Sequence, residues 1–328
     1  MPTVAVTDHT FPNLEVEEGI LKPLGCTLVV RQCKTAAELI ELTRDVDYVI
    51  TQFARVDKSV IKEMKNARLI ARYGIGVDNV DLDAAREKGI PVCNVPDYCM
   101  DEVADHTLSL MLSLTRQILP NAIASANGKW GGAGVPLSSY RVMKEQTVGV
   151  VGFGRIGREV CARLRSFKCN IQVADPAVPA DAISSQGYAP VSLDQLLRTS
   201  DIVTLHCPSM ASTRKMLNAN TFATMKRGAL LLNVARGDLV DSQALVEALK
   251  SGQLLGAALD VFDPEPIPAE HPICKLPNVI LTPHNATATP TAARLLREGV
   301  AAHIARAIQG KPMISIVNGV KPAAAAAR

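Results

Sequence analysis

Short runs of β-branched residues alternate with helix-like patterns over the first hundred residues of the chain. Segments such as AAELIELTRD and KSVIKEMKNA lie between these runs, and their apolar residues recur at spacings of three and four, which is typical of amphipathic helices. This alternation predicts parallel strands joined by crossover helices. The predicted strands are VAVTD (4–8), TLVVRQC (27–33), YVIT (48–51), LIARYG (69–74) and PVCNV (91–95).

A second round of the same alternation starts at Val148. Its apolar runs predict six strands of one doubly wound sheet. These runs are VGVVG (148–152), NIQVAD (170–175), DIVTLHC (201–207), ALLLNVA (229–235), GAALDV (256–261) and NVILTPH (278–284). A helix is predicted after Pro290, and the strand-like KPMISIVN that follows resembles the first hundred residues in composition, so we expect the chain to cross back.

The segment between the two α/β regions, from Pro96 to Val148, predicts a boundary between two domains. Pro96 ends the fifth strand, and a long apolar helical face begins at Glu102, which we interpret as a hinge helix. A chain of 328 residues also exceeds what one hydrophobic core usually supports. We therefore predict an α/β protein with two Rossmann-like/flavodoxin-like domains, doubly wound parallel sheets and a cleft between them. The predicted domains are 1–101 plus 288–328, and 102–287.

Charge and composition argue against several classes of partner and site. The net charge is only +3 and its Lys and Arg residues are scattered, so neither nucleic acid nor a membrane surface is expected to bind. The eight cysteines form no CxxC pair, and the chain starts without a signal-peptide pattern, so we expect a cytoplasmic location. The six histidines show no metal-ligand spacing. The terminal KPAAAAAR is expected to be a disordered end.

The run VGVVGFGRIG, followed by Asp175, has the pattern of an adenine dinucleotide site. Gly152 ends a predicted strand, Gly154 lets the backbone approach a pyrophosphate, and Gly157 lets the next helix pack closely on the strand. A lone pattern of this kind can be an ordinary glycine turn, but a strand precedes it and an acid follows at the spacing of a ribose ligand. The carboxylate of Asp175 repels a 2′-phosphate, so NAD is favoured over NADP.

Three charged residues follow predicted strands of the second domain. Arg236 follows ALLLNVA, Glu265 lies in the loop DPEPIP, and His284 closes NVILTPH. An arginine can hold a carboxylate, a histidine can move a proton near neutral pH, and a nearby carboxylate keeps that histidine charged. Each residue taken alone is more simply explained as a solvated turn or surface residue. Together, behind a dinucleotide site, they predict the reduction of a keto acid.

Several motifs in a fixed order resemble one enzyme family. They extend over residues 4–318 and are YGIGVDNVDLDAAREKGIPVCNVPDY, EVADHTLSLMLSLTR, TVGVVGFGRIG, NVARGDLVD, ALDVFDPEP and LTPHNA. The chain resembles the D-2-hydroxyacid dehydrogenases, which are NAD-dependent enzymes and include glycerate and phosphoglycerate dehydrogenases. The resemblance implies an oxidoreductase that interconverts a small 2-keto acid and its D-2-hydroxy acid. It also makes residues 102–287 the NAD-binding domain and the remainder the substrate-binding (catalytic) domain.

The resemblance also implies roles for individual residues. Arg236 would orient the substrate, Glu265 would be the acid beside the histidine, and His284 would donate or accept the proton. Ile75, Gly76 and Tyr98 would contact the substrate. The implied cofactor-binding residues are Thr107, Gly152, Gly154, Arg155, Ile156, Asp175, His206, Cys207, Pro208, Thr213, Ala235 and Asp260. For Thr107 and for the HCP at 206–208, ordinary packing is an equally good interpretation.

The family resemblance also raises two other functions and predicts one protein partner. A formate-specific enzyme is not expected, because Glu265 stands where that branch has glutamine. GIPVCNVPDY and DNVDLDAA also resemble the NAD(H)-sensing corepressors of the same fold, which bind peptides and turn over little substrate. The family resemblance further implies a homodimer formed through NGKWGGAGVPLSSYR, although Trp130 in that segment could instead fill the chain's own core. No appended regulatory domain is expected.

Overall fold

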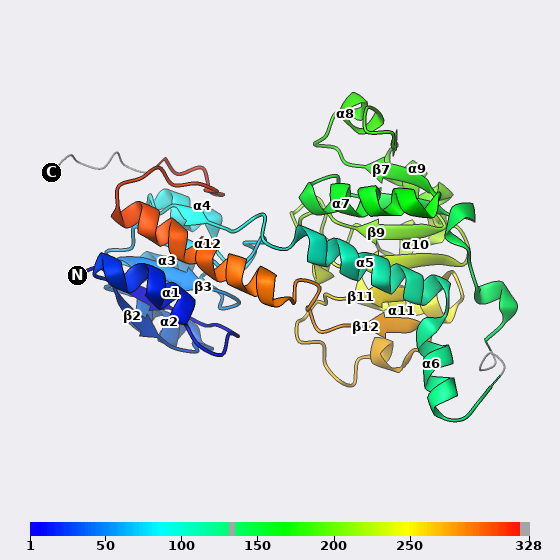
Figure 1. Ribbon diagram of the computed structural model, residues 1–328, viewed down its shortest axis with the longest axis horizontal. Helices are drawn as coiled ribbons and strands as arrows, with labels where there is room; N and C mark the ends of the chain where they lie inside the picture. The colour runs from blue at the N-terminus through cyan, green and yellow to red at the C-terminus, as the bar shows by residue number, and fades with distance from the viewer. Residues whose placement is uncertain (131–134, 322–328) are drawn as a thin grey trace. The chain divides into compact units, whose positions relative to one another are not determined.

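The β-branched runs form two separate parallel sheets in the computed structural model, which describes residues 1–130 and 135–321 (Figure 1). The chain divides into two compact units. One unit comprises Met1–Tyr98 together with the chain from Thr289 onward, and the other comprises Cys99–Ala288. The predicted tail at 322–328 lies outside the described residues.

The first unit contains a five-stranded parallel sheet in the order β2-β1-β3-β4-β5. Each predicted strand is present. The strands are β1 (Thr3–Val6), β2 (Thr27–Val30), β3 (Tyr48–Thr51), β4 (Leu69–Arg72) and β5 (Val92–Cys93). The helices are α1 (Glu15–Leu21), α2 (Ala36–Thr43), α3 (Lys58–Glu63), α4 (Leu82–Glu87) and α12 (Pro290–Ile308). This strand order is flavodoxin-like, as the sequence predicts.

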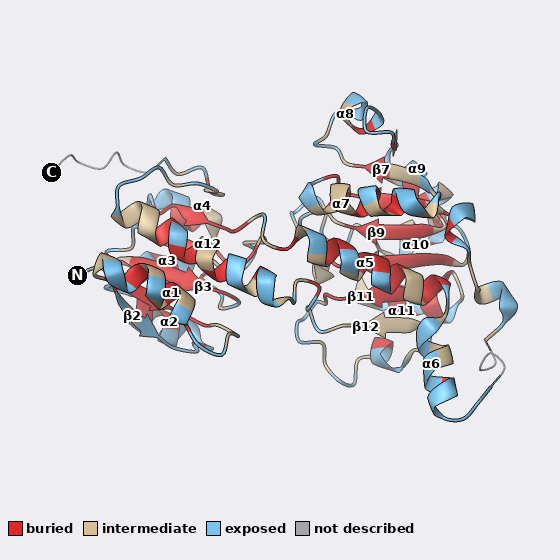
Figure 2. Cartoon of the chain, viewed as in Figure 1, coloured by how far each residue is buried: buried red, intermediate tan, exposed pale blue. Residues whose placement is uncertain are grey.

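Successive side chains of β1, β3, β4 and β5 enter different cores, one on each face of this sheet. Val4 and Val6 of β1 pack in a cluster with α1 and α12, whereas Ala5 between them packs in a cluster with α2, α3 and α4. Burial on both faces explains why these four strands are continuous apolar runs rather than alternating ones, whereas the edge strand β2 is largely exposed (Figure 2).

A buried ion pair joins α1 to α12. The Arg297 guanidinium donates to both carboxylate oxygens of Glu17, with a shortest distance of 2.7 Å, and the Tyr73 hydroxyl donates to Glu17 Oε1 at 2.7 Å. The Glu17 side chain has no exposed surface, so its charge depends on these two partners. The first and last helices of the unit are thereby fixed together.

The second unit contains a seven-stranded parallel sheet in the order β12-β11-β10-β9-β6-β7-β8. Its strands are β6 (Thr147–Val151), β7 (Asn170–Ala174), β8 (Ala189–Pro190), β9 (Ile202–Leu205), β10 (Ala229–Asn233), β11 (Leu254–Leu259) and β12 (Val279–Leu281). The strand order reverses between β6 and β9, and ligands bind at such a switch point in open parallel sheets.

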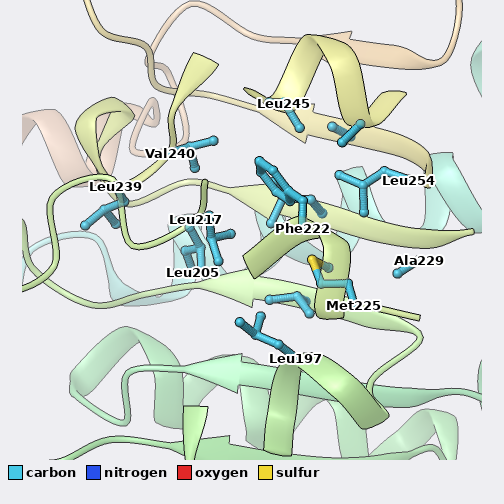
Figure 3. Packing of buried hydrophobic residues seen from close by; sticks show 14 of the residues in the cluster. Leu197, Leu205, Leu217, Phe222, Met225, Ala229, Leu239, Val240, Leu245 and Leu254 are labelled. Carbon is cyan, nitrogen blue, oxygen red and sulfur yellow. The ribbon is translucent and has the colours of Figure 1, made fainter. Parts of the chain in front are cut away.

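Helices cover both faces of this second sheet. The helices of this unit are α5 (Met100–Thr115), α6 (Ile118–Ala126), α7 (Arg155–Leu164), α8 (Ala180–Ser184), α9 (Leu193–Thr199), α10 (Ala219–Thr224) and α11 (Ser242–Lys250), of which α6 extends away from the sheet (Figure 1). Phe222 of α10 and Leu245 of α11 pack on the strand side chains of one face (Figure 3). Helices α5 and α7 pack against each other and contact strands of the sheet.

Two sequence predictions about the strands were wrong. The second sheet has seven strands rather than six, because the two-residue strand β8 has no apolar run that would reveal it. The segment KPMISIVN forms no regular strand and makes a single antiparallel bridge, from Ile316 to Cys93. Ser315 beside that bridge has a left-handed backbone, with φ of 57°, which is incompatible with a continued ladder.

Within residues 1–130 and 135–321, none of the helices has the length and apolar character that crossing a bilayer requires. The described residues also contain no group of three or more His, Cys, Asp or Glu side chains arranged to hold a metal ion. All eight cysteines lie in this described part of the chain, and none of them is in a disulfide.

Candidate active site

The glycine turn after β6 is built from two positions that exclude any side chain. Gly152 has φ of 97°, and a Cβ there would lie 2.7 Å from backbone atoms of His206 and Cys207. A Cβ on Gly157 would lie 2.1 Å from the carbonyl oxygen of Gly152, so α7 packs closely on the turn. Gly154, the N-cap of α7, has open space around it. The turn therefore leaves the N-terminus of α7 open to an anion.

Asp175 lies beside this turn because β7 is the neighbour of β6. Its Oδ2 accepts a hydrogen bond from the Phe153 N–H at 2.7 Å, and its Oδ1 accepts one from the Ala177 N–H at 2.8 Å. The backbone thus holds the carboxylate at the end of β7, where the sequence predicts a ribose ligand.

The segment after β9 approaches the glycine turn from the other side of β6. The His206 N–H donates to Val151 O at 2.7 Å, and the ring Nε2 lies 2.9 Å from Thr204 Oγ1. Desolvation lowers the pKa of His206 to about 3, so the ring is neutral near pH 7. Desolvation likewise raises the pKa of the Cys207 thiol to about 11. Thr213 closes this loop by donating from its hydroxyl to Pro208 O at 2.8 Å.

Glu265 and His284 form a pair in the second unit, with 2.9 Å between Oε2 and Nδ1. Each side chain is about a third exposed, at 33% and 32%. Burial would raise the pKa of the Glu265 carboxyl, but the hydrogen bond and charge of His284 outweigh burial and hold that pKa below its usual range. The Phe262 N–H, which donates to Oε1 at 2.8 Å, acts in the same direction.

Arg236 belongs to the same group of charges, because its guanidinium also favours the ionised form of Glu265. Its Nη1 donates to Ala235 O at 2.7 Å, and its own carbonyl accepts from Asn233 Nδ2 at 2.8 Å. The buried Asn233 at the end of β10 therefore shapes the turn that presents Arg236. The structure brings together the three residues Arg236, Glu265 and His284.

Asp260, directly after β11, ties down the loop that carries His284. Its Oδ1 accepts from the Thr282 hydroxyl at 2.6 Å and the Asn285 N–H at 3.0 Å, and its Oδ2 accepts from the Ala286 N–H at 2.9 Å. Its carbonyl accepts from the His284 N–H at 2.9 Å. His284 itself has φ of 51°, a conformation that needs such support.

Sequence reasoning missed the contribution of Thr282 and Asn285 to this loop. The signal for Thr282 is a hydroxyl directly after a strand, whereas Asn285 contributes its backbone N–H, which has no signal in the sequence. His106 of α5 joins the same network, with its Nε2 3.2 Å from Thr282 Oγ1 and 3.7 Å from Asp260 Oδ1.

Thr107 is fully buried in α5, and its hydroxyl donates to Val103 O at 2.7 Å. This arrangement agrees with the packing interpretation, and contact of Thr107 with a cofactor stays a prediction.

The predicted substrate contacts belong to the first unit, and they are Ile75, Gly76 and Tyr98. Ile75 and Gly76 are half-buried and follow β4 after the sharp bend at Gly74, whose φ is 140°. Tyr98 is also half-buried and packs against the apolar cluster between the sheet and α12.

Comparison with known proteins identifies the family. Residues 108–286 match the family model described as D-isomer specific 2-hydroxyacid dehydrogenase, NAD binding domain. The chain is 39% identical to a D-3-phosphoglycerate dehydrogenase of Methanocaldococcus jannaschii, over 97% of this chain and 60% of that one. It is 35% identical to a glyoxylate reductase of Thermofilum pendens, over 89% of this chain and 88% of that one.

The fold has close counterparts among solved structures. The TT0316 protein of Thermus thermophilus has a TM-score of 0.86 and 35% identity, over 96% of this chain and 99% of that one. The chain spans 55–60% of the length of the D-3-phosphoglycerate dehydrogenases that it matches in M. jannaschii and Archaeoglobus fulgidus. The family model and the full-length likenesses agree. The chain belongs to the D-isomer specific 2-hydroxyacid dehydrogenase family.

Proposed function

We propose that the protein is an NAD-dependent oxidoreductase that interconverts a small 2-keto acid and the corresponding D-2-hydroxy acid. The observation that carries this proposal is the Glu265–His284 pair, 2.9 Å apart, with the charge of Arg236 acting on the same carboxylate. A proton donor beside a cation is what the reduction of a keto acid requires. The pair lies in the unit that contains the match to the NAD binding domain.

We assign the two units different tasks, as the sequence predicts. The unit with the glycine turn would bind NAD, and the unit with Ile75 and Gly76 would bind the substrate. The boundaries from sequence, 1–101 plus 288–328 and 102–287, differ by only a few residues from the division of the structure.

NAD fits the described residues on the evidence of the glycine turn and Asp175. The N-terminus of α7 would hold the pyrophosphate, and Asp175 would accept from the ribose hydroxyls. When bound, the nicotinamide supplies or takes up the hydride. The other cofactor contacts stay predictions, and they are Thr107, Gly154, Arg155, Ile156, His206, Cys207, Pro208, Thr213, Ala235 and Asp260.

In the proposed reduction, Arg236 binds the substrate carboxylate and orients the carbonyl group. His284 donates a proton to the carbonyl oxygen, and Glu265 stabilises the imidazolium form through the hydrogen bond to Nδ1. In the first unit, Ile75 and Gly76 would donate backbone hydrogen bonds to a substrate carboxylate, and Tyr98 would contact the substrate. Oxidation of the hydroxy acid follows the same path in reverse.

We propose that the protein forms a homodimer through α6 and the segment that follows it. Trp130 is 97% exposed, which excludes the alternative that it fills the chain's own core. Several other apolar side chains on this part of the second unit are exposed, namely Ile118, Leu119, Ile123, Leu137 and Val142. Residues 131–134 of the predicted interface lie outside the described residues. Light scattering of the protein and of Ile123→Glu would test this assignment.

The activity is tested by NADH oxidation across a panel of 2-keto acids, including glyoxylate, hydroxypyruvate and a phosphorylated keto acid. We expect turnover on at least one of them, with NADH preferred over NADPH. The names of the relatives are those of dehydrogenases and reductases and do not favour the corepressor alternative. Tight NADH binding without turnover on any keto acid would contradict the proposal.

A further inference from the structure

Two hydrogen bonds from one segment fix the loop after β4 in the first unit. The Val95 N–H donates to Gly74 O at 3.0 Å, and Asn94 Nδ2 donates to Ile75 O at 2.7 Å. Two consecutive carbonyl groups of the loop therefore point toward residues 94–95.

The orientation of these carbonyl groups also determines where two N–H groups point. In a planar trans peptide, the C=O of one residue and the N–H of the next point in opposite directions. The Ile75 N–H shares a peptide with Gly74 O, and the Gly76 N–H shares one with Ile75 O. Both N–H groups are thus directed away from residues 94–95, and among the described residues neither donates to a protein acceptor. Successive N–H groups arranged in this way form a concave anion site.

His303 of α12 in turn holds Asn94. Its ring Nε2 lies 2.8 Å from Asn94 O, and because a carbonyl can only accept, Nε2 carries the hydrogen. Both residues are buried, and His303 Nδ1 has no hydrogen-bond partner within the described part of the chain. Among the residues that the structure describes, the imidazole therefore makes one polar contact, and that contact is with Asn94.

The approach of α12 to this segment is close enough to restrict it. One helical turn before His303, a Cβ on Gly299 would lie only 2.8 Å from Val95 Cγ1. The Asn94 N–H donates in addition to Ser315 O at 3.3 Å. Residues 94–95 are therefore confined between α12 and the loop that they hold.

We propose that Asn94 and His303 are positioning residues that direct the Ile75 and Gly76 N–H groups at a substrate carboxylate. This inference rests on the proposed function, because the carboxylate is that of the 2-keto acid. Neither residue touches the substrate. Asn94 orients the Ile75–Gly76 peptide, and His303 fixes the backbone from which Asn94 reaches it.

The variant Asn94→Asp tests the first step with almost no change in volume. A carboxylate cannot donate to Ile75 O and repels it, so the peptide should turn. We expect the KM for the keto acid to rise about 10- to 100-fold while the Kd for NADH is unchanged. Asn66→Asp makes the same change at an exposed residue of the same unit, whose Nδ2 donates to Asp45 O, and should leave both constants unaltered. Equal effects of the two variants would overturn the proposal.

A pair of substitutions at His303 tests the second step. Leucine fills the buried space without a donor, whereas the glutamine amide can still donate to Asn94 O. We expect His303→Leu to raise the KM for the keto acid about tenfold and His303→Gln to restore most of the loss. Loss of activity that is the same in both variants, or that appears only as weaker NADH binding, would refute the role of His303.

A binding measurement on the unaltered protein separates this inference from the proposed activity. Titration of the NADH complex with oxamate, followed by ¹⁵N-resolved amide spectra, should move the Ile75 and Gly76 resonances most strongly in the first unit. If the enzyme reduces keto acids but these two resonances do not move, the positioning role is wrong. If the resonances move although no keto acid is reduced, the proposed function is wrong and the anion site stands.

Discussion

Glu265 Oε2 lies 2.9 Å from His284 Nδ1, although the two residues are separated by 19 positions and belong to different loops. The contact orients the imidazole through Nδ1, so we expect the proton that reaches the substrate to leave from Nε2. The pair thus defines the orientation of the proposed proton donor.

Replacement of His284 by alanine should remove the proton donor and leave cofactor binding intact. We expect kcat to fall at least about 100-fold, because general acid catalysis contributes factors of that size. NADH fluorescence titration should give an unchanged Kd. His9→Ala, a histidine of the first unit, is the matched control and should retain full turnover. Normal turnover of His284→Ala would remove this residue from the mechanism.

Glu265→Gln should weaken the stabilisation of the imidazolium without removing the ring. The pKa of Glu265 lies below its usual range, so the native residue is a carboxylate at every pH used for an assay. We expect keto acid reduction by the variant to fall about tenfold near pH 7.5, because the neutral amide no longer offers a negative charge to the ring that donates the proton. A pH–rate profile that coincides with that of the wild type would contradict this role.

Asp175→Asn should reduce the discrimination between NADH and NADPH. The amide keeps an oxygen that can accept from the Phe153 N–H or the Ala177 N–H, but it loses the charge that repels a 2′-phosphate. The ratio of kcat/KM for the two cofactors is the measurement, and we expect it to shift toward NADPH about tenfold or more. Asp194→Asn on the exposed face of α9 is a control of equal charge change.

Two glycines of the same turn should respond differently to alanine. Gly157→Ala forces a Cβ against Gly152 O and should lower the free energy of unfolding by about 1–3 kcal/mol. Gly154→Ala meets open space and should leave that free energy nearly unchanged, while it weakens NADH binding by crowding the pyrophosphate. Urea unfolding of the protein without NADH and NADH titration measure the two effects. Equal destabilisation by both substitutions would show that the turn is not packed as described.

The neutral, desolvated ring of His206 should make folding sensitive to acid. The pKa is about 3 in the folded state and about 6.5 when unfolded, so below pH 6.5 the unfolded chain binds the extra proton. Stability from this group is complete above pH 6.5 and declines as the pH falls toward 3. Because part of the residue reaches solvent, we expect a loss of about 1 kcal/mol between pH 7.5 and 5.5. Urea unfolding should show a smaller loss in His206→Gln than in the wild type or in His9→Gln.

The buried parallel strands could be predicted because burial on both faces leaves continuous apolar runs in the sequence. The strand β8 could not, since Ala189–Pro190 carries no such run. The pairing of Glu265 with His284 was foreseeable from the rule that functional residues follow strands in parallel sheets. The contacts of Thr282 and Asn94 were not, because a side-chain hydroxyl or amide that donates to a buried carboxylate or a backbone carbonyl leaves no periodic pattern. The contact of Asn285 was not either, because it is made by the backbone N–H.

The ion pair between Glu17 and Arg297 joins residues 280 positions apart. During synthesis on the ribosome, Glu17 therefore emerges long before its partner, and α1 has no α12 to pack against until Pro290–Ile308 has been translated. The unit from Cys99 to Ala288 is continuous in the sequence, so all of it is available for folding once Ala288 has been translated. We expect that unit to acquire its native form first, while the amino-terminal hundred residues fold fully only after α12 has been translated.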